Sequence, residues 1–198
     1  MRLIPAVAVA AITLAALPAL AQSIEHVRGT IKSFSGQTLV VDTREGPTAT
    51  IMLAPKFSVG AVVPAQLSDA KTGAFIGAAA VGPKSAMRAT EVLIFPEAAR
   101  GSGEGHRAWD VLPNSTMTNG TIKAEVSGSS GRELTVVAKG ETLKVTVPPG
   151  TPIVTFEPAT AAMLTPGTKV FLAVTRAADG TLTAARVNAG KDGLTPPM

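Results

Sequence analysis

The segment 96–118 concentrates the side chains of this sequence that could do chemistry. Residues 96–110 carry five charged side chains in fifteen positions, and they include His106, one of two histidines, and Trp109, the single tryptophan. Carboxylates and an imidazole can ligate a metal ion, an imidazole can act as a general base, and an indole ring can stack on a ligand. The candidate binding residues are Glu97, Arg100, Glu104, His106, Arg107, Trp109 and Asp110.

Two interpretations compete for the charged residues of this segment. In the first, Glu104, His106 and Asp110 bind a divalent transition metal, for which a mixed imidazole and carboxylate set is suited. In the second, the acidic residues pair with Arg100 and Arg107 and brace the segment. We favour the brace because the arginines neutralise the same carboxylates and repel a cation. No cofactor is firmly implied, and a divalent transition metal is the alternative.

The remaining polar and aromatic residues favour structural roles. Trp109 is expected to fill a junction between domains, with its indole N–H bonded to a nearby carbonyl. Gly101–Gly105 lacks the lysine and the helix of a phosphate-binding loop, and it predicts a tight turn. His26 is expected to be an exposed side chain near the N-terminus. A hydrolase is a remote alternative, in which His106 acts as the base on the hydroxyl run Ser115-Thr116-Thr118 and Asp110 orients the imidazole. It is disfavoured because no nucleophile-elbow pattern surrounds Ser115.

The first 21 residues have the pattern of an export signal. Met1-Arg2 is a short positive start, residues 3–17 form an apolar run, and Ala19-Leu20-Ala21 is the small-x-small pattern that signal peptidase cleaves. Cleavage before Gln22 would release the chain into the periplasm or outside the cell. We expect no transmembrane segment after the cleavage site, because no later apolar run approaches the required length.

The composition of the 198-residue chain narrows the function classes further. The formal net charge is +4, with 18 basic and 14 acidic side chains, but no Lys/Arg cluster follows a pattern suited to a phosphate backbone. We therefore expect no nucleic-acid partner. The sequence has no cysteine, which excludes a disulfide scaffold, a thiolate metal site and a cysteine nucleophile.

An internal repeat flanks the segment 96–118. Gly29-Thr30-Ile31-Lys32 recurs as Gly120-Thr121-Ile122-Lys123, and Gly73, before an apolar run, corresponds to Gly167. Each copy contains five short runs rich in Val, Ile, Thr and Leu and bounded by turn residues, which predicts five strands. The predicted strands are about 27–33, 38–43, 49–54, 75–81 and 89–95 in the first copy, and about 119–126, 133–138, 142–147, 169–175 and 182–188 in the second.

Five strands with a helical link after the third are the plan of an OB-type barrel. Residues 64–71 and 158–164 would supply that link, and a glycine inside each first strand permits the bend that a small barrel needs. We predict an all-β protein of two tandem five-stranded OB-like barrels joined by an ordered irregular connector; two open sheets or one sandwich are the alternatives. The predicted boundaries are a signal peptide at 1–21, a first barrel at 22–95, the connector at 96–118, a second barrel at 119–190 and a flexible tail at 191–198.

The connector also carries a family resemblance. It rests on Phe95-Pro96-Glu97-Ala98, Arg100-Gly101, Gly103-Glu104-Gly105-His106-Arg107 and Trp109-Asp110, followed by Ser115-Thr116-Met117-Thr118-Asn119. These residues resemble a block in a family of exported bacterial proteins of unknown function, whose members are often labelled metal ABC transporter permeases. The resemblance extends over both repeats to Gly190-Lys191-Asp192-Gly193. It implies at most a soluble accessory of metal uptake, since no membrane span is expected beyond the signal.

These observations predict an exported, non-enzymatic binding or assembly protein. The connector would be its recognition surface or the brace between its two barrels, and its partner would be a periplasmic protein or a small ligand. A periplasmic metal-binding accessory that uses the histidine and carboxylates of the connector is the alternative.

Overall fold

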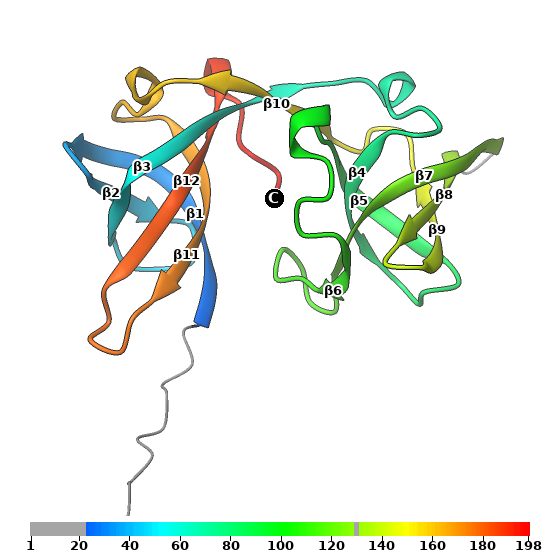
Figure 1. The fold of residues 1–198 in the computed structure, drawn as a ribbon, viewed down its shortest axis with the longest axis horizontal. Helices are drawn as coiled ribbons and strands as arrows, with labels where there is room; N and C mark the ends of the chain where they lie inside the picture. Colours follow the sequence, from blue (N-terminus) through cyan, green and yellow to red (C-terminus); the bar gives the residue numbers. More distant parts are fainter. Residues whose placement is uncertain (1–22, 129–130) are drawn as a thin grey trace, which may run out of the picture.

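The computed structural model describes residues 23–128 and 131–198, which form twelve β-strands and four short 3₁₀ helices (Figure 1). The strands are β1 (Ser23–Ser35), β2 (Thr38–Thr43), β3 (Ala49–Pro64), β4 (Phe75–Val81), β5 (Met87–Ile94), β6 (Gly105–Ala108), β7 (Thr116–Gly128), β8 (Gly131–Ala138), β9 (Glu141–Val147), β10 (Ile153–Ala159), β11 (Lys169–Arg176) and β12 (Leu182–Gly190). The 3₁₀ helices are η1 (Leu67–Asp69), η2 (Glu97–Ala99), η3 (Ala161–Met163) and η4 (Lys191–Gly193). The predicted signal peptide lies outside the described residues.

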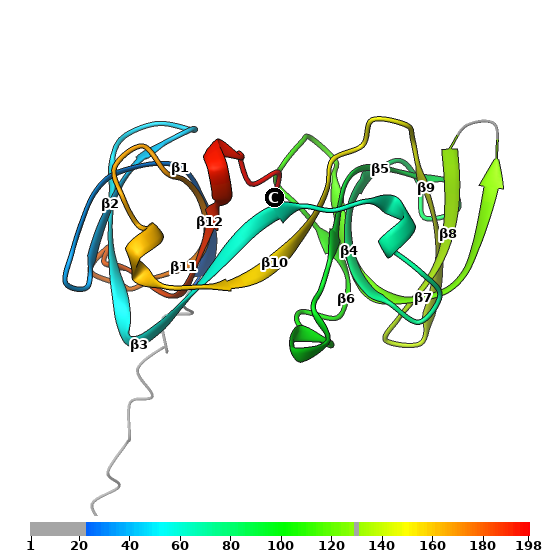
Figure 2. The ribbon, with the colours of Figure 1, turned by 90° about the horizontal axis from the view of Figure 1, so that it is seen from above.

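The strands close into two five-stranded barrels that stand side by side (Figures 1 and 2). Barrel A consists of β1, β2, β3, β12 and β11, in this order around the barrel. Barrel B consists of β7, β8, β9, β5 and β4. Each barrel has one parallel pairing, β3 with β12 and β9 with β5, among antiparallel ones. This is the strand order expected of an OB-type barrel, and the predicted all-β barrel class is confirmed.

Each barrel takes strands from both repeats. Barrel A combines β1 to β3 of the first repeat with β11 and β12 of the second, and barrel B combines β7 to β9 with β4 and β5. The prediction that 22–95 and 119–190 each close a barrel of their own is therefore wrong. The reason is the length of β3, which continues beyond the predicted end at residue 54, through Pro55, to Pro64. The chain therefore leaves barrel A before it can turn back to add a fourth strand to that barrel.

A two-stranded ribbon carries both exchanges between the barrels. Val59–Pro64 of β3 pairs antiparallel with Val154–Ala159 of β10, and six extended residues span about 20 Å. Val62 lies directly opposite Phe156 in this ribbon. The two residues are 94 positions apart (156 − 62), which is also the spacing of Gly73 and Gly167 (167 − 73). The two repeats are thus related by a local twofold axis through this pair. The sequence analysis did not predict β10.

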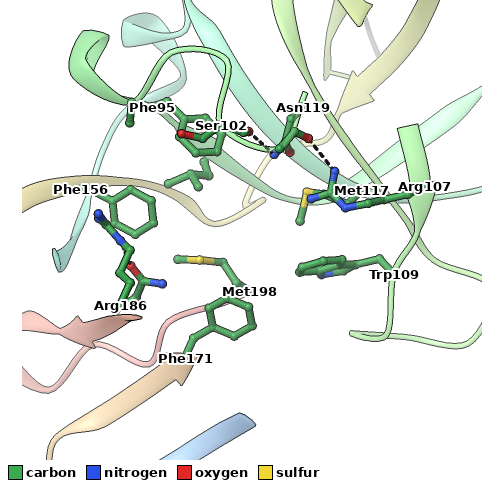
Figure 3. Close-up of a pocket in the computed structure, with 14 residues that line it drawn as sticks. Phe95, Ser102, Arg107, Trp109, Met117, Asn119, Phe156, Phe171, Arg186 and Met198 are labelled. Carbon is green, nitrogen blue, oxygen red and sulfur yellow. Dashed lines mark hydrogen bonds between the residues drawn. The ribbon is translucent and has the colours of Figure 1, made fainter. Parts of the chain in front are cut away.

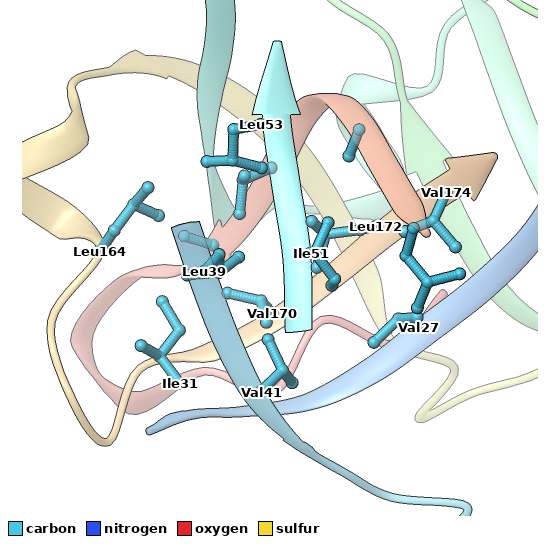
Figure 4. Packing of buried hydrophobic residues seen from close by; sticks show 14 of the residues in the cluster. Val27, Ile31, Leu39, Val41, Ile51, Leu53, Leu164, Val170, Leu172 and Val174 are labelled. Atoms are coloured by element: carbon cyan, nitrogen blue, oxygen red, sulfur yellow. The ribbon is translucent and has the colours of Figure 1, made fainter. Parts of the chain in front are cut away.

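The interiors of the two barrels are built alike. Val27, Ile31, Leu39 and Leu172 belong to the core of barrel A (Figure 4), and Ile122, Leu134 and Val145 to that of barrel B. Gly29 and Gly120 bend the first strand of each set against its neighbour. A Cβ atom at Gly29 would lie 2.2 Å from the Asp42 carbonyl oxygen, and one at Gly120 would lie 2.5 Å from that of Val137. Neither position has room for a side chain.

The C-terminal segment is packed into the cleft between the barrels. Met198 is 3% exposed and belongs to a third apolar cluster with Leu93 and Phe171. Arg28 Nε donates a hydrogen bond of 2.6 Å to the main-chain oxygen of Met198. The prediction of a flexible tail at 191–198 is therefore wrong, because an apolar side chain and a main-chain acceptor both find partners in the cleft.

Among the described residues, no helix has the length and apolar character needed to span a membrane.

Candidate functional site

The connector 96–118 lies between the two barrels, on the side of barrel B that faces barrel A (Figure 1). It begins with η2 and continues into β6, which pairs antiparallel with β7 so that His106 lies opposite Thr118. The connector is thus ordered, as predicted. Its predicted site residues do not form one cluster, because they lie in several separate places along it.

Glu97 and Arg100 form an exposed ion pair at the start of the connector. Arg100 Nη2 donates to Glu97 Oε2 at 2.7 Å and also to the main-chain oxygen of Gly73 at 3.0 Å. The hydrogen bond from Arg100 lowers the pKa of the Glu97 carboxyl. This pair is the one part of the predicted arginine brace that forms in the described residues, and it ties η2 to the loop before β4. The predicted pairing of Glu104 and Asp110 with Arg100 or Arg107 is wrong, because both carboxylates find partners in other parts of the chain.

Glu104 and His106 lie on one side of barrel B, in a hollow of about 270 Å³ that Lys139 and Glu141 also line. Glu104 Oε1 accepts a hydrogen bond from the main-chain N–H of Lys139 at 3.0 Å. His106 Nδ1 lies 2.8 Å from Thr118 Oγ1, and the Thr118 residue is 1% exposed. Burial lowers the pKa of His106, and the positive charge of Lys84 lowers it further.

Asp110 crosses from the connector to barrel A. Its Oδ1 accepts a 2.6 Å hydrogen bond from Arg28 Nη2, and its Oδ2 lies 2.9 Å from His26 Nδ1. Burial opposes ionisation of Asp110, but the hydrogen bonds of Arg28 and His26 outweigh it and lower the pKa of the carboxyl. The expectation of an exposed His26 is wrong: its side chain is 18% exposed and its ring centroid lies 4.2 Å from that of Trp109.

The predicted metal set is not brought together, and of the predicted hydrolase set the structure pairs only His106 with Thr118. Asp110 belongs to the His26 and Arg28 group, whereas Glu104 and His106 lie in the hollow on barrel B. In residues 23–128 and 131–198, no three metal-ligating side chains gather. Ser115 Oγ is bonded to main-chain groups of its own loop, at 2.7 Å from the Leu112 oxygen.

A pocket of about 270 Å³ lies between the barrels, and aromatic side chains form part of its lining (Figure 3). Its walls come from the connector, from β7 of barrel B, from β11 and β12 of barrel A, from the crossing strand β10 and from the C-terminal segment. The lining residues are Leu93, Phe95, Ala99, Ser102, Gly103, Arg107, Trp109, Met117, Asn119, Phe156, Phe171, Arg186, Asn188 and Met198. Two predicted site residues, Arg107 and Trp109, are among them.

Trp109 stands at the junction of the barrels, where it packs between His26 and Arg107. The Arg107 guanidinium carbon lies 5.3 Å from the indole centroid, and the Phe171 ring centroid lies 6.2 Å from it. The expected hydrogen bond of the indole to a carbonyl is not formed, because Trp109 Nε1 is buried without a partner in the described residues. A buried donor without a partner costs free energy that a bound acceptor would recover.

The sequence analysis missed the part of the pocket that comes from other strands. Phe156, Phe171, Arg186 and Met198 are far from the connector in sequence. Phe171 and Arg186 lie in predicted strands and Met198 in the predicted tail, whereas Phe156 lies on β10, which was not predicted. The strand alternation places Arg186 and Asn188 on the outer face of β12, opposite buried Val187. That alternation was the one available signal, and it did not identify what the outer face meets.

A comparison of the chain with protein-family models, with curated proteins and with solved structures found no match in any of the three, so the family resemblance of the connector stays a prediction.

Proposed function

We propose that this protein is an exported, non-enzymatic binding protein whose ligand site is the pocket between its two barrels. The observation that carries the proposal is the composition of that pocket. The two barrels, the connector and the C-terminal segment all contribute to it, and Phe95, Trp109, Phe156 and Phe171 give it aromatic walls. Mostly apolar concave sites with a few convergent polar groups are the usual form of small-molecule sites.

The chemistry of the lining residues supports binding rather than catalysis. The lining set contains arginine, asparagine and serine, but no histidine, carboxylate or lysine that could exchange a proton near neutral pH. His106 faces the hollow on barrel B instead, and its partner hydroxyl on Thr118 is buried. The lining residues are suited to hold a molecule in place.

The connector combines the two roles that its sequence suggested. Asp110 reaches Arg28 of barrel A, and β6 is paired with β7 of barrel B, so the connector fastens one barrel to the other. Between these two attachments, Arg107 and Trp109 face the pocket. The bracing contacts therefore fix the relative position of the pocket walls, which lowers the entropic cost of binding.

The first experiment is a binding screen that uses the fluorescence of Trp109. Because the chain has a single tryptophan, a ligand that enters the pocket would change the emission of the indole that lines it. A set of small organic molecules would be titrated into the full chain, and hits would be confirmed by calorimetry. We expect micromolar or tighter binding of at least one compound at one site per chain.

A matched pair of variants locates the site. Ala99 lines the pocket, whereas Ala98, its neighbour on η2, is exposed and outside the lining set. Ala99→Phe should fill the pocket and weaken binding by more than tenfold, and Ala98→Phe should leave it unchanged. The proposal fails if no compound binds, or if Ala99→Phe binds as well as the original chain while both variants unfold at the same temperature.

Export is tested separately. Expression of the full sequence followed by fractionation and mass spectrometry should yield a periplasmic or secreted chain that begins at Gln22, as the Ala19-Leu20-Ala21 pattern predicts. A full-length chain retained in the cytoplasm would contradict it.

A further inference from the structure

The charged side chains that line the pocket are all of one sign. The lining set includes two arginines, Arg107 and Arg186, and no aspartate or glutamate. The acceptors nearest to this region have other partners or surroundings: Asp110 is bonded to Arg28 and His26, and the main-chain oxygen of Met198 is bonded to Arg28. Glu91 is buried on β5 outside the lining set. The pocket is therefore apolar inside and positive at its rim.

Arg107 is held in place without a carboxylate. Its Nη1 donates to the main-chain oxygen of Gly103 at 2.8 Å, and its guanidinium lies over the Trp109 ring. Within residues 23–128 and 131–198, it has no ion pair. Partial burial lowers the pKa of Arg107 because it removes water from around the charged guanidinium. The other N–H groups of the Arg107 guanidinium are free to donate.

Arg186 is in a similar position at the other end of the pocket (Figure 3). Its Nε donates to Asn188 Oδ1 at 2.8 Å, and its guanidinium carbon lies 4.9 Å from the centroid of the Phe156 ring. It too has no carboxylate partner in the described part of the chain. Partial burial lowers the pKa of Arg186.

Two buried polar atoms of the pocket residues beside Arg107 have no partner in the described residues, the donor Trp109 Nε1 and the acceptor Asn119 Oδ1. Trp109 Nε1 has an N–H without an acceptor. Asn119 Nδ2 is already bonded to the Ser102 oxygen at 3.0 Å, and its Oδ1 lies over Gly77, where a Cβ atom would be 2.8 Å away. An incoming group at this end of the pocket therefore meets unused N–H groups, which an anion satisfies best.

We infer that the pocket binds a small organic anion, with an apolar body, of about the size of a phenyl ring with a short chain, against Phe95, Phe156 and Met198 and a carboxylate toward Arg107. The inference rests on the proposed function and names its ligand class. A cation would meet two arginines without a counter-charge, and a neutral molecule would leave the arginine fork unpaired. A phosphate or sulfonate on the same body shares the anionic chemistry.

The test uses three probes that share a body and differ in charge: 4-phenylbutyrate, 4-phenylbutanamide and 4-phenylbutylamine. Each would be titrated into the full chain, with Trp109 fluorescence and calorimetry as readouts, at about 20 mM and about 200 mM salt. We expect the carboxylate to bind at least tenfold more tightly than the amide, and the amine to bind more weakly than either. The preference for the carboxylate should fall with salt, as for a partly exposed charge pair.

Arg107→Gln and Arg88→Gln form the matched pair of variants. Arg88 is an exposed arginine of the same barrel, on β5, and lies outside the lining set. Arg107→Gln should reduce the carboxylate-to-amide ratio to less than about threefold, while Arg88→Gln should keep it at tenfold or more. Circular dichroism and thermal unfolding would establish that both variants are folded.

Each outcome bears on one of the two proposals. Equal binding of amide and carboxylate, blocked by Ala99→Phe, would leave the pocket a binding site and overturn its preference for anions. A carboxylate preference that survives Arg107→Gln would overturn the role of that arginine. If none of the three probes binds up to about 10 mM, the inferred ligand class is wrong, and the broader screen then decides whether the pocket binds anything.

Discussion

The two barrels agree in their interiors and differ on the sides that face each other. Arg28 in barrel A and Asn119 in barrel B each precede the bending glycine of their repeat. Arg28 lies opposite Phe171 in the strand register and its guanidinium is 5.2 Å from that ring, whereas Asn119 lies opposite Gly77. The same backbone positions therefore hold a cation over an aromatic ring on one side and an amide over a glycine on the other.

A second equivalent pair shows the same divergence. Glu91 of β5 and Arg186 of β12 each precede the corresponding valine of the repeat, Val92 and Val187, which are both fully buried. Glu91 is 2% exposed, whereas Arg186 is exposed at the rim of the pocket. The interior of an OB-like barrel restricts its residues by volume, and the outer face is free to change. The pocket arises on the faces where the repeats have diverged.

The largest effects on stability should come from changes to the bending glycines, which the two barrels have in common. Gly29→Ala and Gly120→Ala should each lower the free energy of unfolding by about 3 kcal/mol or more, because each new Cβ atom would collide with a carbonyl oxygen of the neighbouring strand. Urea denaturation would be followed by circular dichroism and by Trp109 fluorescence. Because the barrels exchange strands, both probes should report one common transition.

Gly46→Ala is the control for these two variants. Nothing lies within 4 Å of a Cβ atom built at Gly46, and its φ is not in the left-handed region. Its effect should be within about 0.5 kcal/mol. Separate transitions by the two probes, with only one shifted in each variant, would show that the barrels unfold independently and would contradict their coupling through the exchanged strands.

The next largest effect is the pH dependence of the free energy of unfolding, which should depend on Glu91 and not on Arg186. Burial raises the pKa of Glu91 to about 7, although the positive charge of Arg28 lowers it in part. The folded chain thus keeps a proton on Glu91 that the unfolded chain loses above about pH 4.5. Glu91 should therefore destabilise the fold as pH rises from about 4.5 to 7, by roughly 2 to 3 kcal/mol in total.

Substitutions at the two positions test this difference. Glu91→Gln should remove that decline and make the chain more stable than the original at pH 8. Arg186→Gln should leave the pH profile unchanged, because a guanidinium keeps its charge throughout this range. The free energy of unfolding would be measured at several pH values between 4.5 and 8 for all three chains. An unchanged profile in Glu91→Gln would contradict the assignment.

A smaller difference is expected between the two positions that precede the bending glycines. Arg28 is 5% exposed and bonds both Asp110 and the main-chain oxygen of Met198, so Arg28→Ala should cost about 2 kcal/mol. Asn119→Ala loses one hydrogen bond, to Ser102, and should cost about 1 kcal/mol. Urea denaturation at pH 7 compares the two. Equal losses would mean that Arg28 does not hold the C-terminal segment in place.

Most of the strands could be predicted from the sequence, but their partners could not. A continuous apolar run between two glycines determines a strand such as β4, and the predicted range 75–81 coincides with it. The same residues bury the same side chains whether β4 closes one barrel or the other. The choice depends on whether the chain turns after Leu53 or continues straight to Pro64, and Pro55 favoured a break where the structure has an extended strand.

The candidate site could be predicted only where it is local. Arg107 and Trp109 stood out because the connector concentrates unusual residue types, and both line the pocket. Glu104, His106 and Asp110 stood out for the same reason, but β6 and the chain after it point them to different neighbours. The partners of Asp110 on β1 lie 82 and 84 residues away in the sequence, and no local pattern connects them.

The smallest effect concerns the turns that follow the second strand of each barrel. In barrel B, β8 and β9 are joined by Lys139 and Gly140, with φ of 47° and 80°, whereas the longer loop 44–48 of barrel A has no residue other than glycine at positive φ. Lys139→Asn should stabilise the chain by about 0.5 kcal/mol, because asparagine adopts this conformation more readily than lysine. Lys139→Ala, which removes the same side chain without that preference, should not. The bond from the main-chain N–H of residue 139 to Glu104 is kept in both variants.

Thermal unfolding of the two variants side by side would separate the backbone effect from the loss of the lysine charge. Equal gains in stability in the two variants would assign the change to the charge.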